Sequence, residues 1–217
     1  MTLTIKLVRH GQSRANVREV EARDVGDHNI ELTDHGKEQA RTVGSTLGAD
    51  YLKDALVYCS PYTRTRQTLE CILEGAGLGR EHVRIYEDPR LREVDPGYSE
   101  YEKQHELRRT HGWFYYRFKG GESPADCFDR TSSFLESLMR QIERKAAEHV
   151  LIVTHGLTIR CFAMRYLHLS VEQFDELANP GNCDVITIGD KHELPGAGWI
   201  TGRWGLVGLR KRGPDEQ

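Results

Sequence analysis

The sequence has neither a long apolar run nor an excess of charge of one sign. None of its stretches is long and apolar enough to cross a membrane, and its amino end lacks the basic start and apolar run of a signal peptide. The 30 Lys and Arg residues and 33 Asp and Glu residues give a formal net charge of -3, which offers no general attraction to nucleic acid or to an acidic membrane. We therefore expect a cytoplasmic protein that acts on a small molecule, with neither nucleic acid nor membrane as a partner.

Cysteine is sparse, and its placement excludes two further classes. The five cysteines are odd in number, lie far apart and show no CxxC or Cys/His ligand spacing; they are Cys59, Cys71, Cys127, Cys161 and Cys183. This pattern predicts reduced thiols, no disulfide framework and no metal site. A Pro/Gly/Ser linker is also lacking, and 217 residues are short for two α/β domains, so we expect a single domain over residues 1–217.

The first informative stretch lies near the amino end. Residues 4–8 are β-branched and apolar, as in a strand, and the chain turns polar at Arg9, His10 and Gly11. In an open α/β sheet, ligands bind beyond the carboxyl ends of the strands. Arginine offers a fork of donors that suits phosphate, and an imidazole can accept a phosphoryl group as a nucleophile. The alternative interpretation is an ordinary basic pair at the surface end of a strand.

A second stretch repeats this ending. Residues 150–153 are the continuous apolar run typical of a strand buried on both faces, and Thr154, His155 and Gly156 follow them. Residues 157–167 continue with helical spacing, so the backbone amides that open this helix would point at whatever lies beside His155. If the two strands are neighbours, two histidines and an arginine meet at one end of the sheet.

Both stretches resemble the motifs of the histidine phosphatase superfamily, in its phosphoglycerate-mutase-like branch. The match rests on Leu7 to Gly11, with Gln12, Ser13 and Asn16 after it, and on Val153 to Gly156, and it spans about residues 4–160. The resemblance implies a phosphohistidine formed on His10 and no cofactor. It also implies a phosphate site built from Arg9, His10, Asn16, His155, Gly156 and the amides that follow the two histidines.

A phosphoryl group in transfer spreads charge over three oxygens, so one arginine is too few. Residues 60–68 resemble the family's Ser-x-x-x-Arg-Ala-x-x-Thr, which implies that Arg64 is the second phosphate arginine, with Thr65 in place of alanine. The resemblance leaves Arg66 as a solvent-facing or substrate-tail residue. Without the family, an arginine at a helix start would be an ordinary surface charge.

The leaving alkoxide needs a proton, and one carboxyl group can serve as acid and then as base. Residues 91–97 resemble the family's Leu-x-Glu before a glycine, which assigns this role to Glu93. Asp95 is the local alternative, and either residue would otherwise be a loop carboxylate in water. Ser99 and Tyr101 stand where the family often has a tryptophan and a glycine.

Strands alternate with helices along the chain, which predicts an α/β fold with a mostly parallel central sheet and helices on both faces. The family resemblance describes this arrangement as a three-layer sandwich. The predicted strands cover residues 4–8, 55–59, 83–86, 149–153, 184–188 and 198–206, and the predicted helices lie between 33 and 48 and over 62–75, 123–148 and 157–167.

Two segments have no motif that assigns them a role. Residues 17–30 are rich in charge and glycine and are expected to form a surface loop near the site, with Asp27, His28 and Asn29 at its crest. Residues 98–122 are expected to form a lid-like insertion; the alternative is an aromatic-rich subdomain that packs on the sheet.

The favoured function is a cofactor-independent phosphatase that hydrolyses small phosphomonoesters. One alternative is a 2,3-bisphosphoglycerate-dependent phosphoglycerate mutase, and an alternative of another class is a non-catalytic phosphate-ligand binding protein. The substrate is then a small phosphorylated metabolite. Relatives of this branch are commonly dimers, so the resemblance also suggests a homodimer.

Overall fold

A single sheet organises the computed structural model, which describes residues 2–97 and 101–213, with the backbone alone for residues 101–103 and 105. Within these residues the sheet has seven strands in the order β3-β2-β4-β1-β5-β7-β6. The strands are β1 (Thr4–Arg9), β2 (Leu56–Cys59), β3 (Ile85–Glu87), β4 (His149–Thr154), β5 (Val185–Asp190), β6 (Trp199–Thr201) and β7 (Trp204–Val207). The four strands from β3 to β1 run parallel, and β5, β7 and β6 extend this core as antiparallel neighbours.

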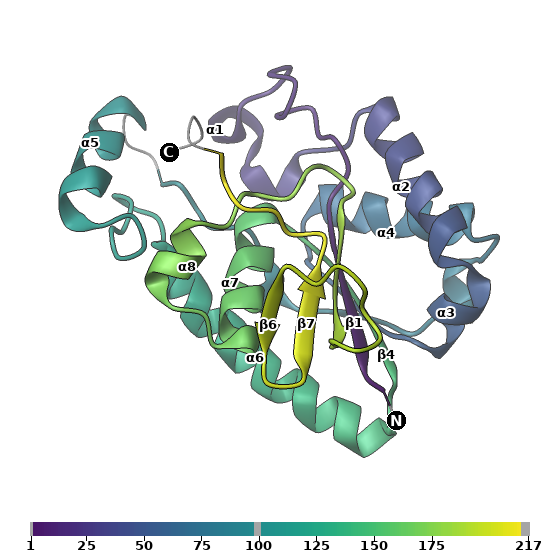
Figure 1. Ribbon diagram of the computed structural model, residues 1–217. Coiled ribbons are helices and arrows are strands. Elements are labelled where there is room, and N and C mark those ends of the chain that lie inside the picture. Colours follow the sequence, from purple (N-terminus) through teal and green to yellow (C-terminus); the bar gives the residue numbers. More distant parts are fainter. Residues whose placement is uncertain (1, 98–100, 214–217) are drawn as a thin grey trace.

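Helices cover both faces of the sheet, so the expected three-layer arrangement is confirmed (Figure 1). One layer contains α2 (Asp34–Leu47), α3 (Ala49–Asp54) and α4 (Thr63–Gly75). The other contains α6 (Pro124–Lys145) and α7 (Gly156–Leu167), with the short α8 (Val171–Asp175) beside it. Two of these helices have side-chain N-caps: the side chain of Thr33 accepts from the Gly36 amide, and that of Ser123 accepts from the Asp126 amide.

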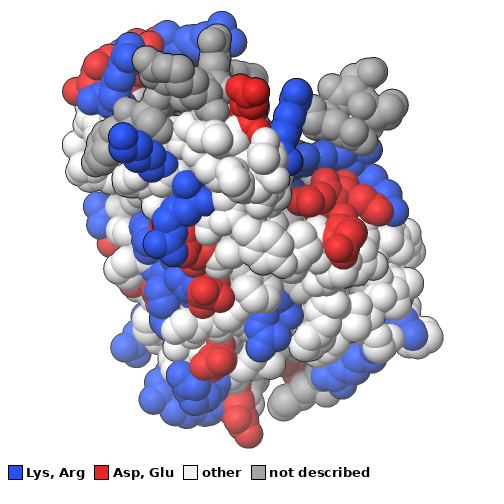
Figure 2. Space-filling model, turned by 90° about the vertical axis from the view of Figure 1, so that its left-hand side faces the viewer, with Lys and Arg blue, Asp and Glu red and all other residues white. Residues whose placement is uncertain are grey.

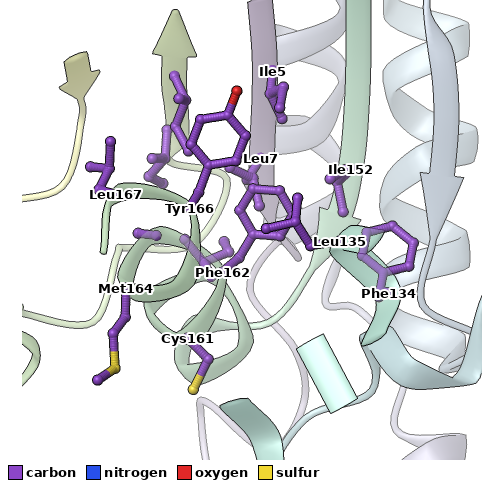
Figure 3. Close-up of a cluster of buried hydrophobic side chains, with 14 of the residues drawn as sticks. Ile5, Leu7, Phe134, Leu135, Ile152, Cys161, Phe162, Met164, Tyr166 and Leu167 are labelled. Carbon is purple, nitrogen blue, oxygen red and sulfur yellow. The ribbon is translucent and has the colours of Figure 1, made fainter. Parts of the chain in front are cut away.

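The alternation of side chains along the strands divides the core in two. Leu151 and Val153 of β4 pack with the layer of α2 and α4, whereas Val150 and Ile152 pack with that of α6 and α7. Figure 3 shows the second cluster, where Phe162 of α7 lies near Ile152 and the side chains of α6. Because β4 is buried on both faces, its sequence is a continuous apolar run.

The structure differs from the predicted elements in several places. Residues 17–30 contain a short helix α1 (Ala22–Val25) and a 3-10 turn η1 (Asp27–Asn29), and the α6 helix ends at Lys145. The single strand expected over 198–206 is wrong: it is a hairpin of β6 and β7, and Gly202 at the turn has a φ of 58°. Two further 3-10 turns, η2 (Arg80–His82) and η3 (Pro89–Leu91), flank β3.

The aromatic-rich segment contains a helix, α5 (Tyr101–His111), which its poor periodicity did not predict. Phe114 and Phe118 beyond it are buried in the core cluster, and Phe114 packs edge-on against Phe174 with ring centroids 5.2 Å apart. This part of the segment therefore packs against α6 and α8. Ser99 lies outside the described residues, as does the side chain of Tyr101.

Candidate active site

The carboxyl ends of β1 and β4 lie side by side, as the repeated motif predicted. Val8 pairs with Val153 and Arg9 with Thr154, and the His10 amide donates to the Thr154 carbonyl at 2.9 Å. The rings of His10 and His155 consequently meet edge to face, with centroids 5.3 Å apart. Parallel pairing in this register is what brings together two residues 145 positions apart in the chain, from position 10 to position 155.

His10 is a buried imidazole held in one orientation by its main-chain neighbour. Its Nδ1 lies 2.8 Å from the Gly11 carbonyl, and because a carbonyl oxygen only accepts, Nδ1 carries the hydrogen and Nε2 keeps its lone pair. Burial, then the nearby Arg64 and Arg9 guanidinium groups, lower the pKa of His10 well below its usual value. The imidazole therefore stays unprotonated at neutral pH, which nucleophilic attack on phosphorus requires.

Arg9 is held at one end and unpartnered at another. Its Nη1 donates to the Pro180 carbonyl at 2.6 Å, while its Nε is buried and has no hydrogen-bond partner among the described residues. Burial lowers the pKa of Arg9, and the carboxylates of Glu93 and Asp184 oppose this shift. An unsatisfied buried guanidinium nitrogen is costly unless a ligand meets it, so Arg9 suits an anion.

Arg64 stands in the first turn of α4, and its side chain is 5% exposed. Its Nη1 and Nη2 contact Asp27 of η1, and its main-chain carbonyl accepts from the Thr68 hydroxyl at 2.6 Å. Thr68 in turn accepts from the Gly11 amide at 3.0 Å. The threonine of this motif thus connects the turn that carries Arg64 to the loop that carries His10.

His155 is fully buried and ends β4 as the N-cap of α7. Its Nε2 lies 2.9 Å from the Ser60 hydroxyl, which also accepts from the Tyr62 amide at 3.5 Å. This favours a hydroxyl that donates to Nε2, and it leaves a hydrogen on Nδ1, which is buried without a partner in the described part of the chain. Burial and Arg64 lower the pKa of His155 well below its usual value, so it is a neutral donor.

The Glu93 carboxylate is tied to the start of α7. It accepts from the Val94 amide at 3.0 Å and from the Leu157 amide at 3.3 Å, and the Thr158 hydroxyl lies 3.4 Å away. A helix N-terminus favours a carboxylate at this place. Asp95 is exposed and accepts from the Gly97 amide in its own loop, so Glu93, and not Asp95, contacts the start of α7.

The segment that carries Glu93 is fixed from both sides. The Thr154 hydroxyl donates to the Leu91 carbonyl at 2.7 Å, and the Thr158 hydroxyl donates to the Arg92 carbonyl at 2.8 Å. On the other side, the Glu122 carboxylate bonds Arg92 and also Arg130, the latter at 3.1 Å. Glu122 therefore helps to position the loop that carries the candidate acid.

One expected part of the phosphate cradle is wrong. The Gly11 amide donates to Thr68, and the Gln12 amide donates to the Gln39 side chain at 3.0 Å, so neither faces a ligand. Thr68 lies on α4 and Gln39 on α2, and α2 approaches so closely that a Cβ on Gly11 would lie 2.4 Å from the Gly36 carbonyl oxygen. The glycine after His10 serves this backbone contact.

Asn16 and Gly156 are predicted parts of the phosphate site, and these roles stay predictions. The Asn16 side-chain oxygen accepts from the Ser13 amide at 3.0 Å and from Asn182 at 3.1 Å. Its amide nitrogen has no partner among the described residues and keeps its predicted role. Gly156 lies against Arg9, since a Cβ there would be 3.6 Å from Arg9 Nε.

Three residues of the site were not predicted as functional. Ser60 and Thr68 are positions of the motif around Arg64, so their hydrogen bonds were open to inference from that motif. Asn182, whose side chain donates to the His10 carbonyl at 3.0 Å, belongs to the β4 to β5 connection and had no signal. The described residues contain no group of three or more His, Cys, Asp or Glu side chains suited to a metal ion.

The chain belongs to the histidine phosphatase superfamily (branch 1), whose family model matches residues 5–198. It is similar to the phosphoglycerate mutase-like protein AT74 of Arabidopsis thaliana, with 40% identity over 83% of this chain and 63% of the relative. It is also similar to an acid phosphatase of Mycobacterium tuberculosis, with 31% identity over 80% of each protein.

The fold matches that of solved structures from the same class. The native structure of mycobacterial glucosyl-3-phosphoglycerate phosphatase superposes with a TM-score of 0.71, covering 95% of this chain and 98% of the other at 22% identity. The chain spans somewhat less than two thirds of the length of AT74. Among the helices in residues 2–97 and 101–213, none has the length and apolar character that a membrane crossing requires.

Proposed function

We propose that this protein is a phosphatase that hydrolyses small phosphomonoesters through a phosphohistidine on His10, with neither metal nor cofactor. The observation that carries the proposal is the imidazole of His10, which is neutral, has a free Nε2 and lies between two arginines and a second histidine. Donors fixed around the point where charge develops are the main requirement for phosphoryl transfer.

The reaction proceeds in two displacements. His10 Nε2 attacks phosphorus as the bond to the leaving oxygen breaks, and the Glu93 carboxyl group gives that oxygen its proton. Water then attacks the phosphohistidine and loses a proton to Glu93, the P–N bond breaks, and Nε2 recovers its lone pair. Arg9, Arg64 and the Nδ1–H of His155 bind the phosphoryl oxygens in both steps, with Asn16 and Gly156 beside them.

The mutase alternative needs a second anion grip that holds a bisphosphorylated intermediate away from water. Three cations of α5, Arg108, Arg109 and His111, are candidates for it. The Arg108 guanidinium lies over the rings of Trp113 and Phe118, 4.5 and 4.8 Å from their centroids, while Arg109 and His111 are exposed. This arrangement supports hydrolysis, since water reaches the phosphohistidine unless it is excluded.

The rest of the molecule also fits a small substrate. Figure 2 shows Lys and Arg side chains interspersed with Asp and Glu over one face of the protein. Such mixing supports a small phosphorylated metabolite and argues against a nucleic acid partner.

We propose a single domain over residues 1–217 with the lid-like insertion at about 98–122; the cytoplasmic location and the homodimer stay predictions.

The deciding experiment follows 3-phosphoglycerate with and without catalytic 2,3-bisphosphoglycerate and counts released phosphate against 2-phosphoglycerate. We expect phosphate to dominate, and isomer formed far faster than phosphate would establish the mutase instead. A parallel assay with a generic aryl phosphate tests the non-catalytic alternative. Turnover together with an acid-labile, alkali-stable phosphoryl group on His10 would exclude a simple binding protein.

A further inference from the structure

Arg64 is paired with an anionic side chain of the protein, that of Asp27. Its Nη1 donates to the main-chain carbonyl of Asp27 at 2.6 Å, and its Nη2 donates to Asp27 Oδ2 at 3.1 Å. The second carboxylate oxygen lies 3.1 Å from Nη1. The Arg64 side chain is 5% exposed and that of Asp27 is 30% exposed, so this ion pair is largely shielded from water.

The contact engages only part of the guanidinium. Asp27 occupies Nη1 and one hydrogen of Nη2, which leaves Nε and the second hydrogen of Nη2 without a partner among the described residues. Those two donors form the side-on fork that binds an oxyanion in a bidentate manner. A phosphoryl group can therefore share Arg64 with Asp27, but it does so beside a second negative charge.

The loop that carries Asp27 is anchored to α4, the helix that carries Arg64. Ile30 and Leu32 behind η1 are 2% and 4% exposed, and the Leu32 amide donates to the Gln67 side chain at 2.8 Å. Gln67 lies on α4, one turn beyond Arg64. The helix that carries the arginine thus also holds the segment that carries its competing carboxylate.

Asp27 reduces the net positive charge around Arg64. Its carboxylate lies against that guanidinium, and burial keeps both neighbouring histidines neutral. With Asp27 in place, the site binds a phosphate dianion more weakly than it would with a neutral side chain at position 27.

We propose that Asp27 competes with the phosphoryl group for Arg64 and so weakens the binding of inorganic phosphate, the reaction product. The inference rests on the proposed function, because it assigns the residue to the same phosphate site. It gives the loop over residues 17–30 a role that no motif in the sequence indicates.

The test is Asp27→Asn. Replacement keeps the main-chain carbonyl that bonds Nη1, so Arg64 stays oriented while the carboxylate charge is removed. We expect the inhibition constant of inorganic phosphate to fall on the order of tenfold, the scale of one unit charge acting at this range in a partly buried site. Structural damage to the loop would weaken binding, so it cannot imitate this result.

Asp24→Asn is the matched control, because it removes the same charge from the same loop at a side chain that is 66% exposed and pairs with Arg23. It should leave the inhibition constant within twofold of the wild-type value. An unchanged or increased constant in a folded Asp27→Asn protein would overturn the inference, since Asp27 would then be neutral or would orient Arg64.

Calorimetric titration with inorganic phosphate separates this inference from the proposed function. Phosphate binding that tightens in Asp27→Asn without any turnover in the parent protein would support the competition and refute the phosphatase. Turnover in the parent with equal phosphate affinity in both proteins would support the phosphatase and refute the competition.

Discussion

The floor of the candidate site and its rim are built in different ways. The floor consists of His10, Arg64 and His155, which are 4%, 4% and 0% exposed and stand at strand ends or in the first turn of a helix. The rim consists of Asp27 and Glu93, which come from a 3-10 turn and a loop and whose carboxylates accept hydrogen bonds from the elements below. The buried floor can hold the phosphoryl group in one geometry, whereas the rim can adjust charge and proton supply.

If this division holds, the largest loss comes from the floor. His10→Ala should reduce turnover by about 10⁴-fold or more, because no other described residue presents a free imidazole nitrogen at this place. Phosphoryl-enzyme trapping should fail in the variant, and His192→Ala, at the opposite end of the sheet, should behave as the wild type. Full activity in His10→Ala would refute the phosphohistidine mechanism and the division of the site into floor and rim.

Removing a carboxylate of the rim should reduce turnover less than removing a residue of the floor. Glu93→Gln should lower the rate on substrates with poor leaving groups by roughly 10²-fold, the usual scale of general acid catalysis, and should retain phosphate binding. An activated aryl phosphate should suffer less, because its leaving group needs no proton. Asp95→Asn is the control and should change neither rate; equal losses on both substrates in Glu93→Gln would indicate a positional role.

A smaller loss of activity is expected from a change at Ser60, which contacts the floor residue His155. Ser60→Ala removes the hydroxyl that bonds His155 Nε2, which should lower kcat/KM by about tenfold through a less defined imidazole tautomer. Ser60→Thr should restore most of the rate because it returns the hydroxyl. Ser45→Ala, at an exposed position, is the control. An unchanged kcat/KM in Ser60→Ala would show that Ser60 has no role in the site.

The smallest effect concerns stability. The lowered pKa of His10 and of His155 means that the unfolded chain binds more protons than the folded one below about pH 6.5, the usual pKa of histidine. The free energy of unfolding should therefore fall as the pH falls, by up to about 1.4 kcal/mol per pH unit for each histidine. Urea unfolding between pH 7 and pH 5.5 measures the slope. His10→Gln should reduce it, and an equal slope in the variant would contradict the burial argument.

Much of the floor was predictable from the sequence. An apolar run that ends in Arg-His-Gly and another that ends in Thr-His-Gly each indicate a strand and a loop, and the family resemblance predicted a role for Arg64 of the floor and for Glu93 of the rim. The short helices α1 and α3 and the hairpin of β6 and β7 were not predicted, since elements of three to six residues carry too little periodicity. Helix α5 was missed because its aromatic and charged residues follow no clear stripe.

The sequence by itself determined which residues end the strands and start the helices, because burial on both faces demands apolar runs and because capping residues act locally. Only the tertiary structure decided which donors face the ligand. The parallel pairing of β1 with β4 brought the two histidines together, hydrogen bonds to α4 and α2 engaged the Gly11 and Gln12 amides, and the packing of η1 on α4 placed Asp27 on Arg64. These outcomes depend on contacts between segments far apart in the chain, and no local pattern of residues encodes such distances.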